Sequence, residues 1–355
     1  MKKSLIALAV LGLSGAAMAQ SSVTLYGVAD AGVGKISAGV VDAANTKYGR
    51  VSLLGGYNDN TNKTQFMSSS LMNNGTSRWG MRGTEDMGGG LKAGFNFEAG
   101  LDLDDGSGGN SFARQANVWL GGDWGTVKLG RQFTPSYLAI GTYELTSQAN
   151  YSVLGNTYKY AGLTQRASSA FAYVTPTFNG LTAAVAYVSK KDYVGLNVWD
   201  VAVLYGNGPI SAGLSVNKVK SGKTDYQLGG KYTFGNFALA ASYTQAGNAG
   251  GVVVNGPEMA QQVYAPLKAT RRGFGIGGSA TFGAFTATLD LTRDTRNQWA
   301  SGSYFNDNGV FTNNKKWTNG VVELKYALSK RTFLYGAYLR LDGTNNYGLG
   351  MRHNF

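Results

Sequence analysis

The sequence predicts an all-β protein, a 16-stranded antiparallel transmembrane β-barrel with an inward-folded third loop. Three observations support this fold class: a two-residue alternation of apolar and polar side chains, an alternation of short and longer connections, and the composition. The chain holds 52 Gly, 21 Tyr and 5 Pro among 355 residues. Because Pro cannot donate to a sheet ladder while Tyr suits strands and membrane interfaces, this composition favours many strands joined by turns.

The first 19 residues read as a secretory signal peptide. Two lysines precede an apolar run, and Ala-Met-Ala at 17–19 offers small residues for cleavage. We therefore expect residues 1–19 to be removed and residues 20–355 to form one barrel domain. No later run approaches the roughly 18 consecutive apolar residues that a transmembrane helix needs.

The chain carries 32 Lys and Arg against 20 Asp and Glu, and it has one His and no Cys. A positive balance can indicate nucleic-acid or anionic-surface binding. Here the basic residues are dispersed rather than gathered in runs, and an exported protein rarely meets nucleic acid. We expect no nucleic-acid partner, and a large continuous sheet does not need the disulfides that an exported chain could form.

The first strands show the alternation in its simplest form. It begins at residues 22–30 and resumes after a long loop, rich in Asn and Gly, over residues 37–73. There Arg78 and Arg82 share the face opposite Trp79. Successive side chains of a strand point to opposite faces, so these two arginines are predicted to face the same side of the sheet.

The clearest strand covers residues 91–102. Leu, Ala and Phe occupy one of its faces, whereas Lys92, Glu98 and Asp102 lie on the other. Such alternation, with ionised groups on the second face, is typical of a strand between lipid and a watery lumen. The same pattern recurs in later segments: 225–234, 285–291, 322–328, 332–341 and 347–355.

The connections between strands indicate how many strands there are. Seven short connections join eight hairpin pairs, which predicts 16 strands: 85–90, 121–125, 178–180, 206–209, 234–236, 282–284 and 329–330. An open sheet edge cannot be left in hydrocarbon, so the sheet is expected to close. Sixteen strands enclose an aqueous channel rather than a packed interior. The long loops over 37–73, 247–270 and 297–317 are expected to face outward.

One connection differs from the others. From Gln132 to Gln165 the chain shows no clear periodicity, and it carries two charges, Glu144 and Lys159, but five tyrosines. A structureless connection of this length is uncommon and usually functional. Polar and aromatic content suits a segment packed against a wet interior wall, and the flanking arginines favour an inward fold. The alternative is an extracellular loop lying over the barrel mouth.

Four motifs together resemble the trimeric general-diffusion porins of Gram-negative outer membranes, in particular their basic, anion-preferring branch. They are Val-Thr-Leu-Tyr-Gly at 23–27, Ser-Arg-Trp-Gly-Met-Arg-Gly-Thr-Glu-Asp at 77–86, Gly-Thr-Val-Lys-Leu-Gly-Arg-Gln-Phe-Thr-Pro at 125–135, and the aromatic strand ending in Phe355. The resemblance covers the whole mature chain. It implies a homotrimer that contacts outer-membrane lipid and lipopolysaccharide and passes small anions and hydrophilic solutes. It also implies that Phe355 is a recognition signal for the barrel-assembly machinery.

The resemblance also implies where the pore is narrowest. In this family the third loop faces a cluster of basic wall residues across the constriction. Four arginines stand at positions that match the basic wall residues of the family, and strand alternation adds a lysine to this group. The only acid of the loop is expected opposite these five basic residues. The predicted constriction residues are Arg78, Arg82, Lys128, Arg131, Glu144 and Arg166. The Pro-Glu-Phe-Gly-Gly loop tip of the enteric relatives is absent from this chain.

Other interpretations stay open at this point. Each arginine could merely pair with a lumenal carboxylate such as Glu98. A substrate-selective channel for anionic or sugar solutes would share the same fold, and the long loops could be bound by phage or antibodies. An outer-membrane enzyme would commonly use a His beside a Ser or Asp. The one histidine, His353, lies on the lipid-facing side near the chain end, so we expect no enzyme, cofactor or metal site.

Overall fold

The computed structural model describes residues 22–37, 63–108, 111–189, 197–220, 222–247, 270–297 and 315–355. The predicted signal peptide, residues 1–19, lies outside these residues, as does most of each long loop expected over 37–73, 247–270 and 297–317. Within the described part, no helix has both the length and the apolar character needed to cross a membrane.

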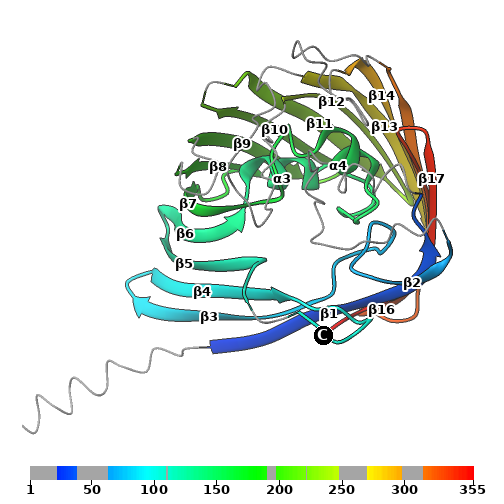
Figure 1. Cartoon of the computed structure of the whole chain (residues 1–355). Coiled ribbons are helices and arrows are strands. Elements are labelled where there is room, and N and C mark those ends of the chain that lie inside the picture. Colours follow the sequence, from blue (N-terminus) through cyan, green and yellow to red (C-terminus); the bar gives the residue numbers. More distant parts are fainter. Residues whose placement is uncertain are drawn as a thin grey trace, which may run out of the picture.

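Sixteen long antiparallel strands form a closed barrel (Figure 1). They are β1 (Ser22–Lys35), β3 (Arg78–Gly88), β4 (Leu91–Gly100), β5 (Gln115–Gly122), β6 (Gly125–Phe133), β7 (Arg166–Val174), β8 (Leu181–Val188), β9 (Val198–Asn207), β10 (Ile210–Val219), β11 (Thr224–Phe234), β12 (Phe237–Gly247), β13 (Thr270–Phe282), β14 (Phe285–Asn297), β15 (Thr318–Ala327), β16 (Thr332–Leu341) and β17 (Thr344–Asn354). A further short strand, β2 (Gln65–Ser68), pairs with β1 beyond the end of β3. The predicted wall of 16 strands is therefore confirmed.

The barrel closes between its first and last strands. β1 pairs with β3 through one part of its length and with β17 through another. At the end of this seam the Gly27 amide donates to the Phe355 carbonyl at 3.0 Å, and the Phe355 amide donates back at 3.1 Å. A Cβ at Gly27 would collide with the Phe355 ring. Glycine there lets the terminal aromatic side chain pack on the β1 backbone.

Side-chain alternation sorts the two faces of the wall as the sequence predicts. Outward positions are apolar and exposed; Leu25 on β1 and Leu349 on β17 are 65% and 64% exposed. Inward positions hold buried polar side chains, such as Gln227 on β11 and Glu323 on β15. An apolar outer band with a polar interior is the arrangement of a barrel that spans a membrane around water.

All seven predicted short connections join hairpins. In three two-residue turns the first position has a positive φ, at Gly208, Gly235 and Gly283. That left-handed conformation matches the twist of the flanking strands and favours glycine. The composition rich in Gly thus has a direct structural use in the tight turns at one end of the barrel.

The connection between β6 and β7 lies inside the ring of strands (Figure 1). It contains two short helices that the sequence reasoning did not predict, α3 (Pro135–Gly141) and α4 (Val153–Tyr158). The Thr134 hydroxyl caps α3 by accepting from the Tyr137 amide, and the Ser152 hydroxyl caps α4 in the same way. α3 packs against β9 and β10, whereas α4 packs against β14 and its neighbours. We call this segment, residues 134–165, the inner loop.

Candidate pore constriction

Three arginines converge on Glu98, which β4 presents to the lumen. The Glu98 carboxylate lies 2.7 Å from Nε of Arg114, 3.5 Å from Nε of Arg78 and 3.9 Å from Nη2 of Arg166. The hydroxyl of Tyr26 donates to the same carboxylate at 3.1 Å. One carboxylate balances one guanidinium, so this cluster keeps an excess of two positive charges (three minus one).

The strand register explains why these side chains meet. Glu98 pairs with Gly80 across β3 and β4, and Arg78 lies two residues before Gly80 on the same face. Diagonal neighbours on one face are within reach of long side chains. Arg114 stands just before β5, where its amide donates to the Glu98 carbonyl at 3.0 Å. The cluster therefore rests on backbone pairing as well as on charge.

Arg166 connects this cluster to the inner loop. Its guanidinium carbon lies 4.4 Å from the centre of the Phe133 ring, and that ring stacks on Tyr137 of α3 with 4.6 Å between centroids. Cation–π contacts of this kind add attraction without neutralising the charge. The start of the inner loop is thus packed beside a guanidinium that stays positive.

Two arginines at this level were missed by the sequence reasoning. One is Arg114; the other is Arg352 on β17, whose Nη1 donates to Asn74 at 2.9 Å and whose charge acts on Arg78. Arg352 alternates with Met351, so strand parity could have placed it in the lumen. Arg114 precedes its strand, and no sequence signal distinguishes it.

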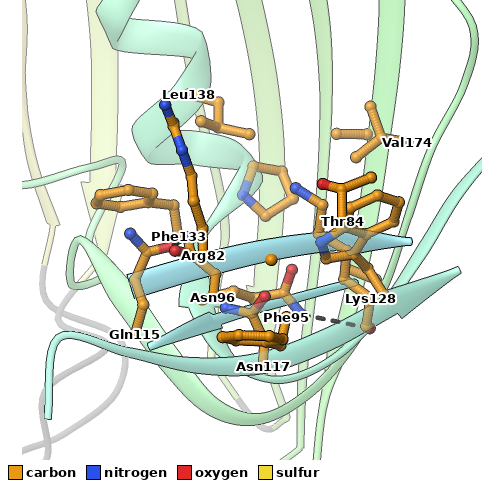
Figure 2. Close-up of a pocket in the computed structure, with 16 residues that line it drawn as sticks. Arg82, Thr84, Phe95, Asn96, Gln115, Asn117, Lys128, Phe133, Leu138 and Val174 are labelled. Atoms are coloured by element: carbon orange, nitrogen blue, oxygen red, sulfur yellow. Dashed lines mark hydrogen bonds between the residues drawn. The ribbon is translucent and has the colours of Figure 1, made fainter. Parts of the chain in front are cut away.

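Arg82 and Lys128 lie apart from Glu98, in a recess between α3 and the wall that Figure 2 shows. The guanidinium carbon of Arg82 is 5.4 Å from the centre of the Tyr26 ring. Within the part of the chain that the structure describes, neither cation has a carboxylate at salt-bridge distance. Both therefore contribute positive charge to the lumen.

Arg131 occupies a β-bulge of β6. The register with β7 shifts between Gly130 and Gln132, and the strand continues to Phe133. The bulge absorbs the extra residue, so pairing resumes beyond Arg131. The Arg131 side chain donates to the Ala113 carbonyl, and to the Ser168 hydroxyl at 2.7 Å. Its neighbours thus differ from those of the arginines around Glu98.

Glu144 is buried inside the inner loop. Its carboxylate accepts from the Thr146 hydroxyl at 2.5 Å and from the Gln148 amide at 2.6 Å. Its charge also acts on Asp290 of β14. The pKa of the neighbouring Tyr143 is raised, mainly by burial and further by the charge of Glu144. The loop acid thus lies near wall acids.

The inner loop binds the acidic part of the wall. The Ser136 amide and hydroxyl donate to Asp200 on β9 at 2.9 and 2.6 Å, and Tyr151 donates to Glu323 on β15 at 2.5 Å. Asp200 and Glu323 are each 1% exposed, whereas the Arg78 side chain is 21% exposed. The loop covers these carboxylates, whereas the arginine side chains around Glu98 keep 10% to 21% of their surface exposed.

Comparisons with known proteins identify the family of the chain. The Gram-negative porin family model matches residues 4–346. Outer membrane porin protein 32 of Delftia acidovorans is 32% identical over 98% of this chain and 92% of its own, and an outer membrane porin of Bordetella pertussis is 30% identical over the full length of both. Among solved structures, an anion-selective porin from Comamonas acidovorans is 26% identical with a TM-score of 0.66, covering 95% of this chain and 100% of its own.

More distant structures share the fold alone. The outer membrane protein OmpT of Vibrio cholerae is 14% identical, with a TM-score of 0.59 over 94% of this chain and 98% of its own. A closed 16-stranded wall, a lumen lined by charge and a family match along nearly the whole sequence agree with one another. The chain belongs to the Gram-negative porins, the water-filled diffusion channels of the outer membrane.

Proposed function

We propose that this porin prefers anions as it passes small hydrophilic solutes and ions by passive diffusion. The observation that carries the proposal is the imbalance around Glu98, where three arginines share one carboxylate. The inner loop adds to the imbalance because it covers Asp200 and Glu323. The anion-selective porin from Comamonas acidovorans, which has the same fold, supports this direction of selectivity.

The proposed constriction keeps the six residues predicted from the sequence, with Glu144 buried in the inner loop that narrows the lumen, and adds Arg114 and Arg352. Guanidinium groups suit this role because they do not lose their protons in proteins. Low-dielectric walls focus the field of such charges into the lumen and raise the local concentration of anions. Unit charges a few ångströms apart interact by roughly 1 to 4 kcal/mol between bulk-water and near-surface screening. Several unbalanced cations can thus change the permeability ratio by about tenfold.

Reversal potentials in planar bilayers under a potassium chloride gradient test this proposal. We expect chloride to permeate faster than potassium, and Arg166→Gln to reduce the chloride-to-potassium ratio. Lys231→Gln is the matched control, because it removes one positive charge on β11, away from Glu98. Faster permeation of potassium through the unmodified protein would overturn anion preference. Equal losses in the two variants would overturn the assignment of selectivity to this cluster.

We also propose a homotrimer that contacts outer-membrane lipid and lipopolysaccharide, with residues 1–19 removed on export. Phe355 is proposed as the signal for the barrel-assembly machinery, and its 49% exposure on the outer face supports that role. Native mass spectrometry of the mature protein tests the stoichiometry and the cleavage together. A trimer of chains that begin at Gln20 is expected. Monomers would contradict the proposed trimer, and chains that retain residues 1–19 would contradict the proposed cleavage.

A further inference from the structure

The recess beside α3 combines a cation with an apolar surface, a pairing that is unusual in a polar lumen (Figure 2). The recess measures about 180 Å³ and lies between the inner loop and strands β3 to β8. Its apolar lining includes the side chains that follow: Trp119, Leu138, Ala172, Val174 and Ala184. The lumen needs no apolar surface for water to pass, so this lining suggests contact with a solute.

Lys128 stands within this apolar patch. The register pairs it with Trp119 on β5 and with Ala172 on β7. Val174, two residues after Ala172 and on the same face of β7, pairs with Ala184 on β8. Within the described residues, no carboxylate lies at salt-bridge distance from Lys128. An ammonium group beside apolar surface gains most from an anion that itself carries an apolar body.

Trp119 offers an aromatic surface next to that ammonium group. Its indole packs directly on Gly94 of β4, where a Cβ would collide with the ring. The side chain is neither buried nor fully exposed, so part of its surface faces the recess. A planar ring beside an indole can adopt an offset-stacked or edge-to-face arrangement.

We propose that Lys128 and Trp119 form a weak binding subsite for aromatic monocarboxylates, the class of benzoate. The carboxylate pairs with the Lys128 ammonium while the ring packs between Trp119 and the patch at Val174. The subsite rests on the proposed anion preference, because the arginines around Glu98 concentrate the anions that it would hold.

The charges around the recess favour a solute with one carboxylate group over a solute with two. In Figure 2 Arg82 stands on the side of Leu138, whereas Lys128 stands on the side of Thr84. An anion held at Lys128 with its other end on the apolar patch would press a second charged group against that patch, where desolvation is costly, because Arg82, the other cation of the recess lining, stands on the opposite side. A sugar would likewise leave hydroxyl groups unpaired there.

Blockade of chloride current in planar bilayers tests the subsite. Benzoate is added in increasing concentration, and two probes each lack one of its features: acetate has no ring, and benzyl alcohol has no charge. We expect benzoate to reduce the current at concentrations where the other two do not. Lys128→Gln should raise the half-blocking concentration by about fivefold or more, since even a fully exposed ion pair contributes up to about a factor of five in affinity and Lys128 is only partly exposed.

Two further variants make the result specific. Trp119→Leu should also weaken the block by benzoate, with little change in the effect of acetate. Lys92→Gln removes a lysine of β4 that does not line the recess, so it should leave the block unchanged. Stepwise conductance in each variant shows that the barrel has folded.

Two results would overturn the subsite: acetate blocking as strongly as benzoate, or Lys128→Gln leaving the benzoate block unchanged. The chloride-to-potassium ratio is measured in the same membranes. A ratio above one without benzoate block rejects the subsite alone, whereas a ratio below one rejects the anion preference on which it rests.

Discussion

Tyr151 of the inner loop donates a hydrogen bond to Oε2 of Glu323 on β15, with 2.5 Å between the oxygens and 172 positions between them in the sequence. Both residues are almost fully buried. Asn74 donates to the same oxygen at 3.4 Å, and the Lys325 ammonium lies 3.0 Å from the other one. This carboxylate joins the inner loop, the barrel wall and the segment before β3.

Tyr151→Phe should destabilise the barrel. The substitution keeps the ring but removes a donor from a buried carboxylate, which costs about 1–3 kcal/mol in the free energy of unfolding. Denaturant unfolding in detergent, followed by circular dichroism, measures the change. Tyr326→Phe is the control, because the Tyr326 ring lies on the outer face of β15, the strand that also carries Glu323. Equal stability of the two variants would show that the bond contributes little.

Glu98→Gln should strengthen anion preference. The variant removes the one carboxylate that the three arginines share, while its amide still accepts a hydrogen bond from Arg114. We expect the chloride-to-potassium permeability ratio to rise about two- to fivefold, which corresponds to roughly 1 kcal/mol or less at water-like screening. Reversal potentials in a potassium chloride gradient give the ratio. A lower ratio than in the unmodified protein would contradict the proposed role of this cluster.

Arg131→Gln should change selectivity less than Arg166→Gln. Both variants lose one charge, but Arg131 donates to the Ala113 carbonyl and the Ser168 hydroxyl of the wall, whereas Arg166 lies with the arginines around Glu98. The charges around Glu98 act together on one part of the lumen. The same reversal-potential measurement compares the variants. A larger effect of Arg131→Gln would show that the β6 bulge, rather than the cluster around Glu98, dominates the selectivity of the constriction.

Arg271→Met should be strongly destabilising. Arg271 forms two parallel hydrogen bonds of 2.9 Å with Asp294, and its Nη1 donates to Asp342 in the turn between β16 and β17. Substituting the buried guanidinium removes the cation that Asp294 and Asp342 share, at a cost of about 3–5 kcal/mol. Gel electrophoresis of samples heated to increasing temperatures measures the heat resistance of the folded barrel, which the destabilised variant should lose. Arg331→Met, in an exposed turn, should leave that resistance unaffected.

Alkaline pH should unfold the inner loop before its phenols ionise in place. Burial raises the pKa of all five of its tyrosines: Tyr137, Tyr143, Tyr151, Tyr158 and Tyr160. A raised folded-state pKa stabilises the folded form below the ordinary value of about 10, and this stabilisation is lost as the pH rises above it. Tyrosinate absorbance and circular dichroism should therefore change together. Ionisation with intact structure would contradict this.

Alternation along the strands predicted most of the fold, because lipid and water impose opposite polarities on the two faces of every strand. The same rule placed Arg78 and Arg82 on one face and would have found Arg352. It does not apply to Arg114, which precedes its strand, or to Arg131, where a bulge interrupts the two-residue period.

The inner loop was recognised from its tyrosines and scarce charges, yet its two helices were not. They are only seven and six residues long, too short for helical periodicity to appear. The Thr134-Pro135 pair at the start of α3 was an available signal, since Thr is a common N-cap and Pro suits the first helical position. The contacts of Ser136 and Tyr151 with wall acids depend on strands far along the chain, which local patterns do not reveal.

The hydrogen bonds between Gly27 and Phe355 also constrain how the molecule assembles. They join the beginning of the first strand to the last residue, so the sheet cannot become a cylinder until the end of the chain has arrived. Contacts between such distant residues form slowly, because the entropy of closing a very long loop is lost before any pairing compensates for it. Until then the first and last strands each expose an edge of unpaired backbone N–H and C=O groups, which can pair with strands of other chains. Completion of the barrel is therefore a single late event, and a chain that lacks its last strand has no route to it.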